Sequence, residues 1–142
     1  MADNSGNRRI LVGVDGSPNS QKAADWAVSF AHPGDTVILL AAWSPVVVPA
    51  EMAMTYTFDD TGMKKILEDE HKRVSQIASS RGVAIATHFE NNDPRNALLS
   101  TASDLVVLGA RGHGGVMGLL LGSVADYVAR HSKVPVVIVP AK

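Results

Sequence analysis

Continuous apolar runs alternate along this chain with segments in which apolar residues recur every three or four positions. Short runs rich in Val, Ile and Leu are typical of strands that are buried on both faces of a sheet. A weaker alternation at 83–89 also predicts a strand. The expected strands are Arg9–Val14, Thr36–Trp43, Val83–Phe89, Leu105–Leu108 and Val134–Val139.

Each of the first four expected strands is followed by a segment with helical spacing. Ser17 and Asp93 are expected N-caps, because each precedes a proline that suits the first helical position. Gly82 is expected just beyond a helix C-terminus. The expected helices run from Pro18 to a stop signal at His32, over Thr61–Arg81, from Pro94 to about Thr101 and over Val124–His131.

Strands that alternate with helices predict an α/β fold. We expect one domain over 1–142, a Rossmann-like doubly wound sandwich of five parallel strands in order 3-2-1-4-5 with helices on both faces. Residues 1–7 are expected to be a flexible tail. Residues 44–60 have no clear period and predict a variable loop, in which Met52–Phe58 fits either a hydrophobic lid or disorder.

The composition narrows the classes of function. A net charge of -1 and 5% aromatic residues give no electrostatic or stacking case for nucleic acid, nor an electrostatic case for a membrane surface. The chain has no cysteine, which excludes disulfides and zinc–thiolate sites. It shows neither a signal peptide nor a membrane-length apolar run, so we expect a cytoplasmic protein.

The segment GARGHGGVMGLLLGS, Gly109–Ser123, lies between the fourth strand and the last helix. A strand, a glycine-rich turn and a helix together present backbone N–H groups to a phosphate. The segment has no Gly-Lys pair for a Walker A loop, and Met117 stands where the dinucleotide fingerprint needs its last glycine. It is therefore interpreted as an anion cradle for a nucleotide polyphosphate at the crevice beside strand 1.

The glycine spacing is G-x2-G-x9-G-[ST], with Gly109, Gly112, Gly122 and Ser123. Together with ILVGVDGSPNSQKAADWA, NDPRNALL and GSVADYVARHSKVPVVIV, this motif resembles the nucleotide-binding subgroup of the universal stress protein family. The resemblance implies a five-stranded Rossmann-like fold, ATP with Mg or Mn in the crevice, and homodimers.

The resemblance also implies roles for individual residues. Asp15 would lie near the ribose or adenine, Gly13 would line the base pocket, and the backbone around Ala42 would face adenine. Ser123 and the N–H of Val124 would cap the phosphates, and both Asp15 and Ser123 could reach a metal bound to ATP. The phosphates would be wrapped by Gly109, Arg111, Gly112, His113, Gly114 and Gly115, and Ala110 and Gly122 are further expected nucleotide-binding residues of this segment.

Plainer roles stay open for several of these residues. Asp15 also suits a simple turn, and Ser123 also suits an N-cap of the last helix. Arg111 and His113 fit either a phosphate contact or a solvent-facing position. The acidic residues Glu68, Asp69 and Glu70 are expected on a solvated face, and no histidine has metal-ligand spacing with a neighbouring carboxylate.

The last strand, Val134–Val139, is apolar on both faces and is expected at the sheet edge. Exposed apolar edges invite pairing with another chain. Pairing with the same strand of a second copy would cover this edge, which predicts a homodimer.

The favoured function is an ATP-binding stress-response or signalling module with little or no turnover, because the loop lacks the carboxylate sets of phosphoryl-transfer enzymes. A slow ATPase, a binder of AMP or cyclic AMP, and an interaction module with an empty crevice stay open. The downstream protein partner is not specified by the sequence.

Overall fold

The computed structural model describes residues 7–44, 60–111 and 121–141. The expected tail to residue 6, the loop 45–59 and the glycine-loop residues Gly112, His113, Gly114 and Gly115 lie outside the described residues. Among the described helices, none combines the length and apolarity needed to cross a membrane.

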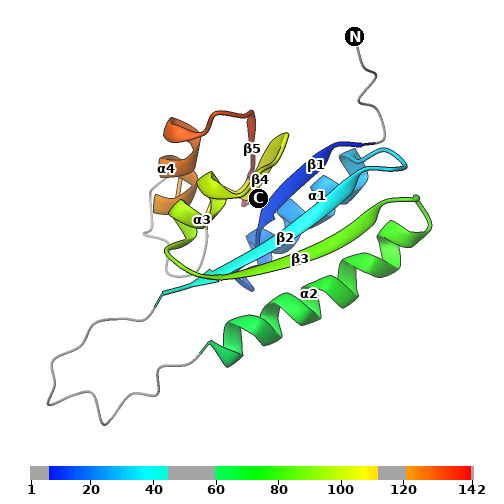
Figure 1. The fold of residues 1–142 in the computed structure, drawn as a ribbon, viewed down its shortest axis with the longest axis horizontal. Coiled ribbons are helices and arrows are strands. Elements are labelled where there is room, and N and C mark those ends of the chain that lie inside the picture. Colours follow the sequence, from blue (N-terminus) through cyan, green and yellow to red (C-terminus); the bar gives the residue numbers. More distant parts are fainter. Residues whose placement is uncertain (1–6, 45–59, 112–120, 142) are drawn as a thin grey trace, which may run out of the picture.

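Five parallel strands form one sheet in the order β3-β2-β1-β4-β5, which confirms the predicted fold (Figure 1). The central strand β1 pairs with β2 on one side and with β4 on the other, with Leu11 opposite Ile38 and Val106. The strands are β1 Arg9–Gly13, β2 Thr36–Trp43, β3 Ala84–Asn91, β4 Leu105–Gly109 and β5 Val136–Val139. Strand β5 begins two residues later than expected, because Pro135 has no N–H for the ladder.

Helices cover both faces of the sheet. The helices α1 and α2 enclose one apolar cluster with the sheet, and α3 and α4 enclose a second cluster on the opposite face (Figure 1). The helices are α1 Pro18–Phe30, α2 Thr61–Ser79, α3 Pro94–Ser100 and α4 Ser123–His131. The alanines at 23, 24 and 27 are fully buried, so their small side chains let α1 lie close to the sheet.

Local signals fix the helix ends. The Ser17 hydroxyl accepts a hydrogen bond from the Ser20 N–H at 3.1 Å, and the Asp93 carboxylate accepts one from the Arg95 N–H at 2.8 Å. Both predicted N-caps are therefore confirmed. Gly82 has a φ of +72°, as expected just beyond a helix, although α2 ends at Ser79, two residues before the predicted end.

Candidate functional site

The winding of the sheet reverses between β1 and β4. The chain leaves β1 toward α1 on one face, and after β4 it continues to α4 on the opposite face. Gly13 and Gly109 are the last residues of these two neighbouring strands. The carboxyl ends of the two strands therefore flank a crevice of the type that binds ligands in open α/β sheets.

Asp15 lies in the turn that follows β1. Its Oδ1 accepts a hydrogen bond from the Ser17 N–H at 2.8 Å, and Gly16 makes the turn possible with a φ of +83°. Among the described residues, the second carboxylate oxygen, Oδ2, has no hydrogen-bond partner. The turn thus orients a half-buried carboxylate and leaves one of its oxygens for another group.

The two strand-terminal glycines are sites of close approach. A Cβ at Gly13 would lie 2.8 Å from Leu108 Cδ2, and a Cβ at Gly109 would lie 2.8 Å from Asn19 Cγ and 2.9 Å from the Asn19 carbonyl oxygen. At Gly109 a side chain would collide with the backbone of α1, whereas at Gly13 it would collide only with the end of the Leu108 side chain. Gly109 therefore lets α1 lie against the end of β4, and Gly13 leaves space for the Leu108 side chain at the end of β1.

The two ends of the glycine-rich segment lie together. The Gly122 N–H donates to the Ala110 carbonyl at 2.6 Å, which brings the start of α4 to the end of β4. The Ala110 N–H donates to the Val139 carbonyl at 2.9 Å, and the Arg111 N–H donates to Asn19 Oδ1 at 2.7 Å. These three amides are already used within the protein.

Helix α4 begins one residue earlier than the capping hypothesis requires. Gly122 is its N-cap, because the Asp126 N–H donates to the Gly122 carbonyl at 3.0 Å, and Ser123 is the first helical residue. The interpretation of Ser123 as the N-cap is therefore wrong. Ser123 is exposed, and the N–H groups of Ser123 and Val124 belong to the first turn, where a helix offers no internal acceptor.

Ala42 presents its backbone toward the same crevice. The Leu40 carbonyl accepts from Val14 on the β1 side at 2.8 Å, whereas the Trp43 carbonyl accepts from Asn92 on the β3 side at 3.0 Å. Alternate residues of a strand turn their backbone groups to opposite sides, so Ala42 has the orientation of Leu40. Strand β1 ends opposite Leu40, so the N–H and C=O of Ala42 face the space beyond its end.

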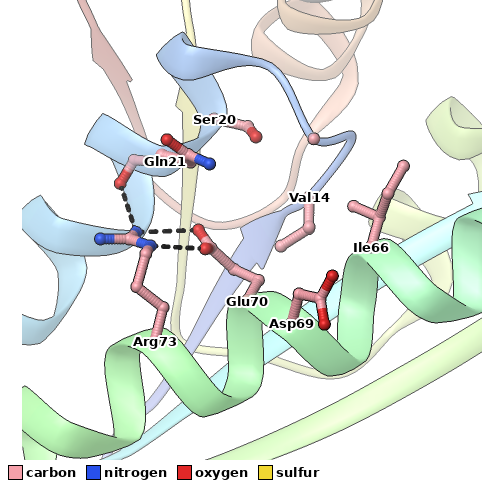
Figure 2. Close-up of a pocket in the computed structure, with 8 residues that line it drawn as sticks. Val14, Ser20, Gln21, Ile66, Asp69, Glu70 and Arg73 are labelled. Atoms are coloured by element: carbon pink, nitrogen blue, oxygen red, sulfur yellow. Dashed lines mark hydrogen bonds and ion pairs between the residues drawn. The ribbon is translucent and has the colours of Figure 1, made fainter.

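A cavity of about 250 Å³ lies next to the Asp15 turn, between the first turns of α1 and the middle of α2 (Figure 2). Glu70 and Arg73 from α2 meet in its wall, with Arg73 Nε 2.7 Å from Glu70 Oε1 and Arg73 Nη2 2.9 Å from Glu70 Oε2. Arg73 also donates to the Gln21 carbonyl of α1 at 3.2 Å. The cavity is lined by Val14, Gly16, Ser20, Gln21, Ile66, Asp69, Glu70 and Arg73.

The expectation that Glu70 lies on a solvated face is wrong, because its side chain is only 5% exposed. Glu70 is four residues from both Ile66 and Val74 and so shares the face that α2 turns toward α1. Its paired carboxylate holds the pKa of Arg73 above the usual range. The sequence signal for the burial of Glu70 was its i,i+3 spacing from Arg73, because an arginine at this distance can pair with a buried carboxylate.

Sequence reasoning also missed Asn19, the acceptor for the Arg111 N–H. Of the implied site residues, Gly13, Asp15, Ala42, Gly109, Ala110, Arg111, Gly122, Ser123 and Val124 are described, and they lie at the carboxyl end of the sheet or at the start of α4. Within 7–44, 60–111 and 121–141, no group of three or more His, Asp or Glu side chains could hold a metal ion.

Comparison with known proteins adds an independent finding. The sequence model of the universal stress protein family matches residues 6–140. A universal stress protein of Mycobacterium tuberculosis is 33% identical over 153 residues, which cover 94% of this chain and 48% of that protein. This chain therefore spans about half the length of the mycobacterial relative.

Solved structures share the fold. The universal stress protein UspA from Lactobacillus plantarum superimposes with a TM-score of 0.78 at 21% identity, covering 93% of this chain and 97% of that chain. A universal stress protein solved in complex with cAMP superimposes with a TM-score of 0.69 at 28% identity, covering 95% of this chain and 98% of that chain.

Proposed function

The chain belongs to the universal stress protein family, and we propose that it binds an adenine nucleotide, ATP with Mg²⁺ or Mn²⁺, in the crevice between β1 and β4. In this proposal the protein is a nucleotide-dependent stress-response or signalling module with little or no turnover. The observation that carries it is the hydrogen bond between Ala110 and Gly122, which brings the first turn of α4 to the end of β4.

The phosphates are assigned to the start of α4. The N–H groups of Ser123 and Val124 carry the partial positive charge of a helix N-terminus, which favours an anion. The Arg111 side chain, half-buried at the end of β4, supplies a full positive charge. Because the amides of Ala110, Arg111 and Gly122 are used internally, we assign no phosphate contact to those three N–H groups.

The nucleoside is assigned to the β1 side of the crevice. The N–H and C=O of Ala42 form a donor–acceptor pair that suits the edge of a purine base. The unpartnered Oδ2 of Asp15 suits a ribose hydroxyl. A divalent ion would arrive with the triphosphate, and Asp15 and Ser123 are the residues that we expect to reach it.

The absence of turnover is inferred from the chemistry of the described residues. Phosphoryl transfer usually uses carboxylates that hold magnesium and a further group that orients the nucleophile. In the described part of the crevice, Asp15 in the turn after β1 is the carboxylate that we assign to the site. It is partly exposed to solvent. A bound nucleotide would then shift a population of states without being consumed.

AMP or cyclic AMP is the second candidate ligand. The 28% identical universal stress protein was solved in complex with cAMP. A ligand with a single phosphate would place that phosphate at the N-terminus of α4 and its base at Ala42. It would need no binding groups for two further phosphates.

Mass spectrometry of small molecules released from the denatured protein, followed by calorimetric titration with ATP, AMP and cAMP, tests the proposal. We expect ATP to bind most tightly and inorganic phosphate to be released at a negligible rate. At 100 times its dissociation constant, ATP should raise the free energy of unfolding by about 2.7 kcal/mol. If none of the three nucleotides binds, the crevice is empty and the chain is an interaction module.

We expect Asp15→Ala to weaken ATP binding roughly tenfold or more, because a carboxylate that accepts hydroxyl hydrogen bonds contributes more than 1.4 kcal/mol. The matched variant Asp15→Asn keeps an acceptor for the Ser17 N–H, so it preserves the turn. Calorimetry measures the affinities, and melting curves without nucleotide measure the fold. Unchanged ATP affinity in Asp15→Ala would remove Asp15 from the site.

We further propose that β5 pairs with the same strand of a second copy. Strand β5 is an edge strand of four half-buried apolar residues, Val136–Val139. Apolar edges are normally covered, and self-pairing creates a two-fold interface.

Val137→Lys is expected to convert the dimer to a monomer or to an insoluble protein, because it places a charge on the edge strand, at a side chain that packs against the apolar cluster of α1 and the sheet. Thr87→Lys, at an exposed position on the opposite edge strand β3, is the control and should leave the association state unchanged. Light scattering after size-exclusion chromatography measures both. A soluble, unchanged Val137→Lys dimer would show that the interface lies elsewhere.

A further inference from the structure

Asn19 occupies an unusual position in the first turn of α1. The residue is buried, with only 7% of its surface exposed. It does not cap its own helix, because the Ser17 hydroxyl already accepts from the Ser20 N–H. All the hydrogen bonds of its carboxamide go to residues far away in the sequence.

These hydrogen bonds join three segments at the carboxyl edge of the sheet. Asn19 Oδ1 accepts from the Arg111 N–H at 2.7 Å, directly after β4. Asn19 Nδ2 donates to the carbonyls of Val139 and Pro140 at 3.1 and 3.2 Å, at the end of β5. One side chain thus connects the first turn of α1 to the points where the chain leaves β4 and β5.

The neighbouring backbone keeps this arrangement tight. A Cβ at Gly109 would lie 2.8 Å from Asn19 Cγ, so the carboxamide lies directly against the end of β4. The carboxamide also has one possible orientation, because a flipped amide would set Nδ2 against the Arg111 N–H and Oδ1 against two carbonyls. The Arg111 amide is therefore held at a defined place and direction.

We propose that Asn19 is a positioning residue for the nucleotide site, and this inference rests on the proposed nucleotide binding. Its oxygen fixes the direction in which the chain leaves β4, and with it the place of the Arg111 guanidinium beside the phosphates. Its nitrogen anchors the carboxamide to the end of β5, so that the oxygen stays on the Arg111 N–H. Asn19 itself touches no nucleotide atom.

Asn19→Ala is the test, read out with two ligands. Losing the anchor at Arg111 should weaken ATP binding about tenfold and leave adenosine binding within about twofold, because adenosine has no phosphate to position. A general loss of folded protein would instead weaken both ligands by the same factor. Competition against a fluorescent ATP analogue measures both affinities under identical conditions.

The matched control is Ser132→Ala, which also removes two hydrogen bonds beside β5 but does so at the opposite end of the strand. It should leave both affinities unchanged. Amide hydrogen exchange provides the second measurement, since the Arg111 N–H should lose protection in Asn19→Ala and keep it in Ser132→Ala.

The outcomes separate the two proposals. If the wild-type protein binds ATP and Asn19→Ala binds it equally well, or loses ATP and adenosine affinity in equal measure, the role of Asn19 is refuted and nucleotide binding stands. If the wild-type protein binds neither ATP, AMP nor cAMP, the proposed function is refuted, and the positioning role with it.

Discussion

Gly109→Ala is expected to lower the free energy of unfolding by about 3 kcal/mol, the upper range for overpacking a tight contact. The new Cβ would lie 2.8 Å from Asn19 Cγ, 2.9 Å from the Asn19 carbonyl oxygen and 3.0 Å from its carbonyl carbon. Two of these atoms belong to the backbone of α1, so no side-chain rotation relieves the contact. The helix and β4 must move apart, which also breaks the hydrogen bond that the Arg111 N–H donates to Asn19 Oδ1.

Gly62→Ala is the matched control, because a Cβ at this position of α2 meets no atom of the described residues within 4 Å outside its own stretch of helix. It should stabilise the protein by roughly 0.4–1 kcal/mol, since alanine restricts the unfolded chain and favours the helix. Urea denaturation compares the two variants with the wild type. Equal stabilities of Gly109→Ala and the wild type would mean that α1 does not lie against β4 as described.

The second large effect is expected at Asp35, in the turn between α1 and β2. Its side chain is fully buried, and Oδ2 accepts from Arg8 Nη2 at 2.8 Å and from the His32 N–H at 2.8 Å. Oδ1 accepts from the Arg8 N–H at 3.0 Å. Burial alone would raise the pKa of this carboxyl, but the hydrogen bonds from Arg8 and His32 outweigh burial and lower its pKa to about 2.

Asp35→Asn should therefore lower the free energy of unfolding at pH 7 by about 2 kcal/mol or more. The ordinary pKa of 3.8 applies in the unfolded chain and about 2 in the folded protein, so the stabilisation is present above pH 4. It is lost as the pH falls from about 4 through about 2, because the carboxyl then becomes protonated in the folded protein as well as in the unfolded chain.

Urea denaturation at pH 7, 4 and 2.5 checks this dependence. The gap between the wild type and Asp35→Asn should narrow as the pH falls. Asp69→Asn serves as the control, because the Asp69 side chain is 57% exposed and its ion pair with Lys65 is solvated, so this variant should stay close to the wild type. A gap of constant size at all three pH values would contradict the proposed charge effect.

The sequence predicted those features of the fold that depend on neighbours along the chain. Buried parallel strands read as continuous apolar runs, and α1 and α3 each begin with a capping residue followed by proline. The predicted strand order placed Asp15 and Gly109 at neighbouring strand ends, where the structure has them. The boundaries that shifted by two residues, at β3, β5 and α2, lie where hydrogen bonding and not apolar spacing decides the end.

The interactions that the sequence did not reveal are those between distant residues. Asn19 and Arg111 are 92 positions apart, and no local pattern links a polar residue in a helix's first turn to a strand end. Glu70 looked like one member of an acidic surface, because its burial depends on the place of α1 and on Arg73. The start of α4 at Ser123, with Gly122 as its N-cap, likewise depends on the backbone geometry of the helix and not on the preference of serine for caps.

The bond from the Gly122 amide to the Ala110 carbonyl has a consequence for how such a protein diversifies. It joins the end of β4 directly to the start of α4, so insertions, deletions or replacements within 112–121 need not disturb the sheet or α4. On the proposed function, changes confined to this stretch would alter the nucleotide site and leave the sheet in place. The same property makes it a natural place to graft a reporter peptide and build a biosensor.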